Sequence, residues 1–167
     1  MVDLKPHSAE WPRSFDEQVP FIRAALGDNL VQIHHIGSTS IPNILAKPIV
    51  DILVEVKAID VVDSHAEAME RAGFEAKGEY GIPQRRYFRK SDAEGQRTHH
   101  IHIFETGAEP AVRHIAFRDY LRAFPEKARS YSELKARLAD LEGQDYQAAK
   151  SAFVEELQEQ AIRWMEN

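Results

Sequence analysis

Hydrophobic and polar residues follow two different periods in the first two thirds of the chain. Apolar residues recur every three or four positions in residues 10–26, which predicts a helix that Pro20 kinks or breaks. Runs that are rich in β-branched and aromatic residues predict strands instead. We expect a second helix at 60–72, with Gly73 after its end, and strands at 30–36, 48–56, 74–80, 85–90 and 98–105.

The last third of the chain shows only the helical period. From Glu109 onward the pattern indicates helices, and the apolar side chains of residues 145–165 fall on one helix face. Strands that precede a run of helices predict an α+β fold with a mixed β-sheet flanked by helices. We expect a single domain over residues 1–167, with an α/β part to about residue 108 and a C-terminal helical part over about 109–167.

The composition is typical of a globular domain. The 167 residues are 43% hydrophobic and carry a net charge of −6, so a broad interface with nucleic acid is not expected. The absence of cysteine excludes disulfides and thiolate metal sites, and it favours a cytoplasmic location. No apolar run approaches the roughly 20 residues of a membrane helix, so we expect no membrane partner. The sequence leaves the oligomeric state open.

Two of the predicted strands combine an apolar face with a face that could carry chemistry. Side chains alternate along a strand. The valines and isoleucine of one strand face the core, so Asp51 and Glu55 point the other way. The isoleucines of a later strand face the core, so His100 and His102 point away from it. If the two strands pair, these carboxylates and imidazoles could bind a divalent metal on one surface. The alternative is the solvated face of a one-sided sheet.

A glycine–serine turn precedes the strand that contains Asp51. Glycine lets the backbone approach a ligand closely, and a short helix after the turn would direct free N–H groups at an anion. We therefore expect phosphate binding at Gly37, Ser38 and Thr39. Basic side chains could clamp the same phosphate, or they could be ordinary surface charges. The candidates are Lys47, Arg86 and Arg118 in first place, and then Arg85, Arg89, Arg122 and Lys135.

The stretch GSTSIPNILAKPIVDI, residues 37–52, resembles the signature of the GrpB family, which belongs to the nucleotidyltransferase superfamily. The resemblance implies a nucleotidyltransferase-like fold, a GS motif that holds a triphosphate, and strand carboxylates that bind two metal ions. Family members fused to dephospho-CoA kinase hint at coenzyme A or nucleotide metabolism. The other matches follow in order along the chain: Trp11–Phe15, Arg85–Arg89, His100–His102, Phe117–Arg122, Tyr131–Lys135, Tyr146, Lys150 and Trp164.

The chain departs from the superfamily pattern at Leu53, where the resemblance implies a second strand carboxylate. One hypothesis is a metal-dependent nucleotidyltransferase with Asp51 as its catalytic residue. Its Mg²⁺, or another divalent metal, would be bound by Asp51 together with Glu55, His100 or His102. The second hypothesis is a non-catalytic protein that binds a nucleotide or a phosphorylated small molecule after losing the second carboxylate. A structural scaffold without a ligand site is the third.

Overall fold

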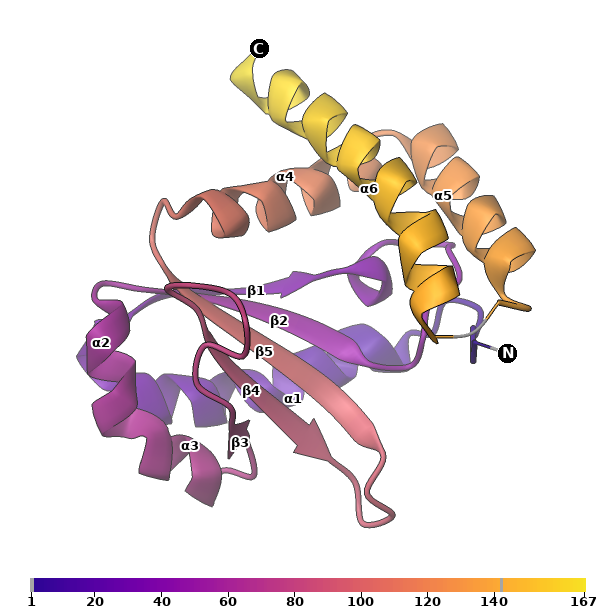
Figure 1. The fold of residues 1–167 in the computed structure, drawn as a ribbon. Coiled ribbons are helices and arrows are strands. Elements are labelled where there is room, and N and C mark those ends of the chain that lie inside the picture. Colours follow the sequence, from indigo (N-terminus) through magenta and orange to yellow (C-terminus); the bar gives the residue numbers. More distant parts are fainter. Residues whose placement is uncertain (1, 142) are drawn as a thin grey trace.

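The computed structural model describes residues 2–141 and 143–167 and has an α+β fold built on a five-stranded mixed sheet (Figure 1). The strands lie in the order β1-β2-β5-β4-β3. β2 and β5 run parallel, and the other neighbours run antiparallel. The strands are β1 Leu30–Ile36, β2 Val50–Val56, β3 Glu75–Ala76, β4 Arg86–Ser91 and β5 Arg97–Glu105.

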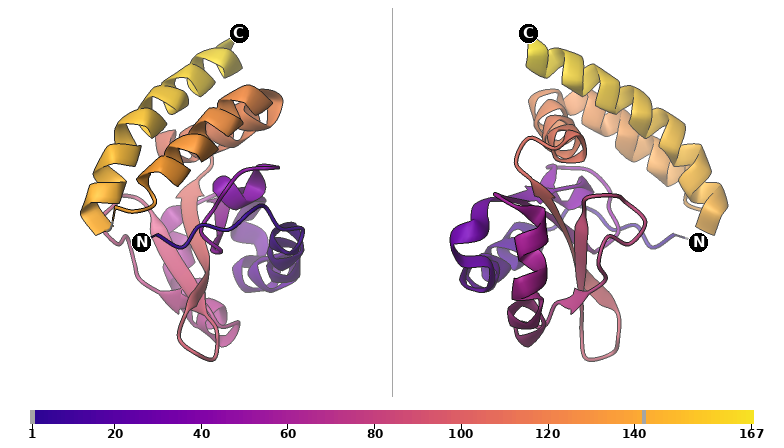
Figure 2. Two further views of the ribbon diagram at one scale, coloured as in Figure 1. Left: turned by 90° about the vertical axis from the view of Figure 1, so that its right-hand side faces the viewer. Right: turned by 60° about the vertical axis from the view of Figure 1, so that its left-hand side comes forward.

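Helices lie on both sides of the sheet (Figure 2). One side carries α1 Glu10–Leu26, α2 Ile59–Val62 and α3 Ala66–Arg71. The other side carries α4 Glu109–Ala123, with α5 Pro125–Leu138 and α6 Gly143–Glu166 packed against it. Short 3₁₀ helices occur at η1 Gly27–Asn29, η2 Ser38–Ser40 and η3 Asp63–His65. Within the described residues, no helix is long and apolar enough to cross a membrane.

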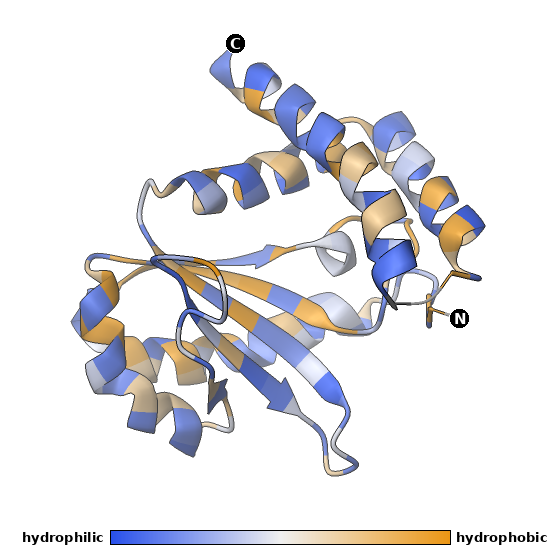
Figure 3. Cartoon of the chain, viewed as in Figure 1, coloured by the Kyte–Doolittle hydropathy of each residue, from blue (hydrophilic) through white to orange (hydrophobic). Residues whose placement is uncertain are grey.

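Alternation along the strands divides the apolar residues between two cores. Figure 3 shows hydrophobic and hydrophilic residues alternating along β2 and β5. Ile52 and Ile101 belong to the larger core, which packs against α1, α2 and α3. On the opposite face, Leu53 packs with Ile36, Phe104 and Ala111 of α4. Leu53, at the position where the resemblance implies a second carboxylate, is a fully buried core residue.

The helical part is attached to the sheet part through the loop that follows the GS turn. Ile41 and Ile44 are buried in an apolar cluster with side chains of α4, α5 and α6. Burial of apolar area is the main force available to such packing. The cluster therefore places α5 and α6 beside the turn that begins at Gly37, although these helices are far from it in sequence.

The structure confirms part of the predicted element pattern. α1 spans the predicted residues 10–26 and continues through Pro20 without a break, and β1 spans 30–36 as predicted. The single helix predicted at 60–72 is wrong, because η3 separates α2 from α3. Gly73 does follow α3 with a φ of 97°, as expected for a residue that ends a helix.

Two strand predictions also need correction. β3 contains only residues 75–76 of the predicted 74–80, because Gly78, Tyr80 and Gly81 have φ values of 61°, 50° and 87° that an extended strand cannot hold. β2 begins at Val50 and not at residue 48. The preceding backbone forms a turn in which the Ile49 N–H donates to the carbonyl of Lys47.

Candidate functional site

The pairing of β2 with β5 brings Asp51 and two histidines together. Asp51 lies opposite His100 in the parallel register, and His102 is two residues further along β5. Asp51 Oδ1 lies 3.4 Å from His102 Nε2 and 3.7 Å from His100 Nδ1. The prediction that these strands are neighbours, with the three side chains on one face, is confirmed.

Gly37 makes room for the carboxylate of Asp51. The β1–β2 register pairs Ile36 with Asp51, so the turn begins beside this side chain. A Cβ atom at Gly37 would lie 2.7 Å from Asp51 Oδ2, and the glycine φ of 73° is one that other residues rarely adopt. The glycine is thus required at this position for both space and conformation.

Asp51 is ionised in the folded protein. Burial by itself raises the pKa of this carboxyl, but hydrogen bonds from His100 and His102, and the charges of the two imidazoles, lower it by more. The net pKa lies well below the ordinary value of an aspartate. The side chain keeps 33% of its surface exposed, so the charge remains accessible from the neighbouring cavity.

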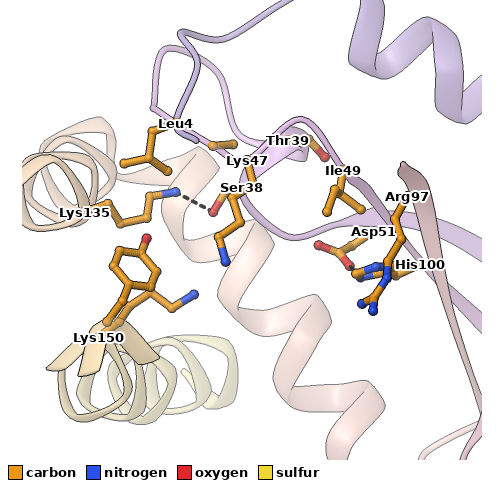
Figure 4. A pocket seen from close by; sticks show the side chains of 12 residues that line it. Leu4, Ser38, Thr39, Lys47, Ile49, Asp51, Arg97, His100, Lys135 and Lys150 are labelled. Carbon is orange, nitrogen blue, oxygen red and sulfur yellow. Dashed lines mark hydrogen bonds and ion pairs between the residues drawn. The ribbon is translucent and has the colours of Figure 1, made fainter. Parts of the chain in front are cut away.

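A cavity of about 300 Å³ opens between Asp51, the GS turn and the helical part (Figure 4). Its walls carry lysine, arginine and histidine side chains against the carboxylate of Asp51. Arg97 and His100 come from β5, whereas Lys135 and Lys150 come from α5 and α6. The lining residues are Leu4, Ser38, Thr39, Ala46, Lys47, Ile49, Asp51, Arg97, His100, Lys135, Tyr146 and Lys150.

Lys135 is the most deeply buried of these cations. Only 2% of the residue is exposed, and its Nζ donates to Ser38 Oγ at 2.8 Å. Burial, followed by repulsion from Lys150 and Lys47, lowers the pKa of Lys135 to about 7. Burial and Lys47 also lower the pKa of Lys150. The lysines therefore destabilise one another's charged forms in this cavity, and a bound anion would relieve that repulsion.

Arginines of α4 hold the backbone at both ends of the GS turn. Arg122 Nε donates to the carbonyl of Ser40 at 2.9 Å, and Arg118 Nη1 donates to the carbonyl of His35 at 3.3 Å. Thr39 is buried, and its hydroxyl lies 2.9 Å from His35 Nε2. These contacts fix the conformation of the turn, and neither arginine is among the residues that line the cavity.

Three of the foremost predicted site residues lie elsewhere in the fold, and Arg85, Arg89 and Arg122 also lie outside the cavity lining. Glu55 points to the same face as Asp51 but lies four residues along β2, a separation of about 13 Å, and it bonds to His34 at 2.6 Å. Arg86 forms ion pairs with Asp63 and Asp60. Arg118 contacts Asp119, His34 and the His35 carbonyl. The predicted residues that the cavity brings together are Ser38, Thr39, Lys47, Asp51, His100 and Lys135, and Gly37 and His102 lie next to Asp51.

The sequence prediction does not include Arg97, Tyr146 and Lys150, three of the lining residues, in the site. Lys150 and Tyr146 are four positions apart on α6 and so share a helix face. That spacing is a usable signal, but it does not say what the face contacts. Arg97, at the start of β5, has no local pattern to distinguish it from other surface charges.

The described residues do not form a ready metal centre. Among residues 2–141 and 143–167, no group of three or more histidine, aspartate and glutamate side chains is arranged to hold a metal ion. Asp51 is the one carboxylate among the described lining residues, and Leu53 is buried in the apolar core. Two-metal catalysis needs several anionic ligands, so the side chains present do not fit a pair of Mg²⁺ ions.

The fold places the chain in a class of proteins with a nucleotidyltransferase-like fold. Terminal uridylyl transferase 4 from Trypanosoma brucei, solved with bound dUTP, matches this structure with a TM-score of 0.53. The match covers 78% of this chain and 44% of that one at 12% sequence identity, so it shows a shared fold alone.

Within that class, the chain belongs to the GrpB family, whose model, described as GrpB protein, matches residues 1–160. The crystal structure of conserved protein GrpB from Enterococcus faecalis has a TM-score of 0.92 and 37% identity, and the match covers 99% of this chain and 100% of that one. UPF0157 protein YqkA from Bacillus subtilis (strain 168) is 42% identical over 166 residues. That alignment covers 98% of this chain and 48% of YqkA, so the chain spans about half of this relative.

Proposed function

We propose that the cavity binds the phosphate chain of a nucleotide or of another phosphorylated ligand. The observation that carries this proposal is the gathering of Lys47, Lys135 and Lys150 around Ser38 in one cavity. Bringing like charges together and burying one of them costs free energy unless an anion balances them. Phosphate oxygens are the acceptors that ammonium groups and backbone turns commonly hold.

The two ends of the cavity suggest how such a ligand would lie. Figure 4 shows Lys135 and Lys150 on one side, Asp51, Arg97 and His100 on the other, and Ser38 with Lys47 between them. A phosphate chain could interact with the lysines at one end while its other end lies beside the ionised Asp51. Repulsion between Asp51 and phosphate would orient the ligand and leave the carboxylate free for a second group.

The resemblance to nucleotidyltransferases implies Mg²⁺, but the carboxylates available do not suit two ions, as described above. We therefore assign phosphate binding to the cationic side chains, and we propose that it does not require a divalent metal. In this account the lysines supply the positive charge that balances the ligand. Binding of ATP in EDTA should then be within about threefold of binding in Mg²⁺, a difference below 1 kcal/mol.

The test is isothermal titration of ATP into the wild-type protein and into a Lys47→Ala/Lys150→Ala variant. Loss of two charge-assisted contacts should weaken binding by at least about tenfold. Lys57→Ala is the matched control, because Lys57 is exposed and lies beyond the far end of β2. Equal affinities for the double variant and the control, or no binding by the wild-type protein in either buffer, would contradict the proposal.

Nucleotidyl transfer is the second candidate function, and the ionised Asp51 between two histidines at the cavity favours it. The carboxylate could orient an acceptor hydroxyl, whose oxygen would bond to the α-phosphorus while the bond from that phosphorus to pyrophosphate breaks and an imidazole accepts the hydroxyl proton. Pyrophosphate release from a nucleoside triphosphate, measured with Mg²⁺ or Mn²⁺ present, should then be lost in Asp51→Asn while ATP binding is retained. Equal release by the wild-type protein and the variant would rule out this role for Asp51.

A further inference from the structure

We infer that the cavity recognises its ligand by the phosphate chain and not by the base, so that an unsubstituted triphosphate binds as well as any nucleoside triphosphate. This inference rests on the proposed function and narrows it to one substrate class. The class is phosphate chains with three or more negative charges, whatever organic group is attached to the chain. The cavity's side-chain chemistry, its aromatic residue, its charge and its size each support this preference.

The described side chains that line the cavity include no carboxamide, the group that pairs with both edge positions of an adenine. Base edges present patterns of donors and acceptors that asparagine and glutamine match well. Among the described residues that line the cavity there is no asparagine or glutamine. The serine and threonine hydroxyls of the lining already have partners, since Ser38 accepts from Lys135 and Thr39 lies within hydrogen-bond distance of His35. What faces the ligand is mainly ammonium, guanidinium and aliphatic carbon.

The aromatic residue of the cavity is also poorly placed to stack on a base. Tyr146 is 1% exposed, and two ammonium groups lie over its ring, with Lys47 Nζ at 5.2 Å and Lys150 Nζ at 5.4 Å from the centroid. A base needs an exposed ring face to stack. The ring of Tyr146 instead positions the two lysines, and so contributes to phosphate recognition through them.

The charge of the cavity matches a long phosphate chain better than a short one. Lys47, Lys150 and Arg97, together with Lys135 once it is protonated, face the single lining carboxylate of Asp51 in the described chain. The cationic excess is then about three charges, which a triphosphate can balance and a monophosphate cannot. Lys135 reinforces this, because an ammonium has three N–H donors and its Nζ has one hydrogen-bond partner, Ser38, among the described residues.

The size of the cavity also favours recognition of the phosphate chain over the base. Its volume is about 300 Å³. Pockets that enclose drug-sized ligands have volumes of about 300–1,000 Å³, so this cavity is at the lower limit. A phosphate chain that occupies the lysine side would leave little enclosed space for a sugar and a base. The group attached to the chain would therefore project towards solvent, where its identity changes the affinity little.

Isothermal titration in EDTA tests this with tripolyphosphate, ATP, GTP, UTP and orthophosphate as probes. Tripolyphosphate and the three nucleotides should bind with dissociation constants within about threefold of one another, and orthophosphate should bind at least about tenfold more weakly. Lys150→Ala should weaken tripolyphosphate and ATP by the same factor, and Lys57→Ala should change neither. A common factor is expected because both ligands would use the same contacts.

The outcomes separate this inference from the proposed function. If one nucleotide binds more than about tenfold tighter than the other nucleotides and tripolyphosphate, base recognition is real and the inference fails while the proposed function stands. If orthophosphate binds as tightly as tripolyphosphate, the inferred preference for a chain of three or more charges is wrong. If no probe binds the wild-type protein, the proposed function fails and the inference fails with it.

Discussion

The sheet wall of the cavity carries the carboxylate of Asp51, whereas the helix wall carries the ammonium groups of Lys135 and Lys150. The sheet wall is held by the β1–β2 and β2–β5 hydrogen-bond ladders and by the close contact between Gly37 and Asp51. The helix wall is held by apolar packing on the loop after the turn. The difference indicates that changes to the sheet wall should cost mainly stability, and changes to the helix wall mainly ligand affinity.

Gly37→Ala should give the largest effect and should act on the sheet wall. The new Cβ would lie 2.7 Å from Asp51 Oδ2, and the residue would also be strained at a φ of 73°. We expect unfolding free energy to fall by about 3 kcal/mol, combining backbone strain with overpacking.

Gly95→Ala is the control for this substitution, because Gly95 has a φ of 81° but nothing within 4 Å of a built Cβ. Gly95→Ala introduces backbone strain without a steric contact, so it should lower the unfolding free energy by about 1 kcal/mol. Denaturant unfolding measures both. Equal losses in the two variants would show that the contact between Gly37 and Asp51 does not constrain the turn.

Lys135→Met should give the next largest effect and should act on the helix wall. Methionine keeps most of the aliphatic stem and removes a buried ammonium, so tripolyphosphate should bind about tenfold more weakly. Unfolding free energy at pH 7 should stay within about 1 kcal/mol, or rise, because a costly buried charge is lost. Lys127→Met on the same helix is the control for affinity. A variant that unfolds readily while it retains full affinity would reverse the assignment of this wall.

The effects of pH on stability and on binding should be smaller, and the pKa of Lys135 determines the sign of each. The pKa of Lys135 falls from 10.5 to about 7 on folding, so the unfolded chain holds a proton between these values that the folded apoprotein releases. The contribution of Lys135 to the unfolding free energy therefore increases as the pH rises from about 7 to 10.5.

Binding should show the opposite trend. Tripolyphosphate affinity depends on the charged lysine, so it should decrease above about pH 7, by no more in total than the roughly tenfold loss expected for Lys135→Met. Titrations at pH 7 and pH 8.5 measure this, and Lys135→Met should flatten the slope. Affinity that increases with pH in the wild-type protein would contradict the linkage.

Glu55→Gln should give the smallest effect on the ligand. Glu55 bonds to His34 at a position about 13 Å along β2 from Asp51. We expect tripolyphosphate affinity to change by less than about twofold, and the measurement is the same titration. A loss of tripolyphosphate affinity close to that of Lys135→Met would mean that the ligand site extends along β2 from Asp51 to Glu55.

The comparison of the two walls also explains what the sequence can predict. Strand alternation is a local property, so the order of residues is enough to place Asp51, His100 and His102 on one face. Alternation places Glu55 there too, because it gives the face of a residue and not its distance along the strand. Arg118 is a predicted phosphate ligand, but α4 directs it to a backbone carbonyl behind the turn.

The helix wall cannot be predicted to the same extent. Lys135 and Ser38 are 97 residues apart, and their contact depends on how α5 and α6 pack around Ile41 and Ile44. An apolar stripe shows which helix face is buried but not which surface covers it. From the sequence, Lys150 can therefore be matched to the family but cannot be assigned a role.

The most direct test of the central claim is an amide chemical-shift titration of the ¹⁵N-labelled protein with tripolyphosphate in EDTA. The account predicts that the largest shifts fall on Gly37, Ser38 and Thr39 and on the first turns of α6 around Lys150, and that Lys47→Ala/Lys150→Ala loses them. Shifts concentrated elsewhere, with Ser38 and Lys150 unchanged at saturating ligand, would show that this cavity is not the phosphate site.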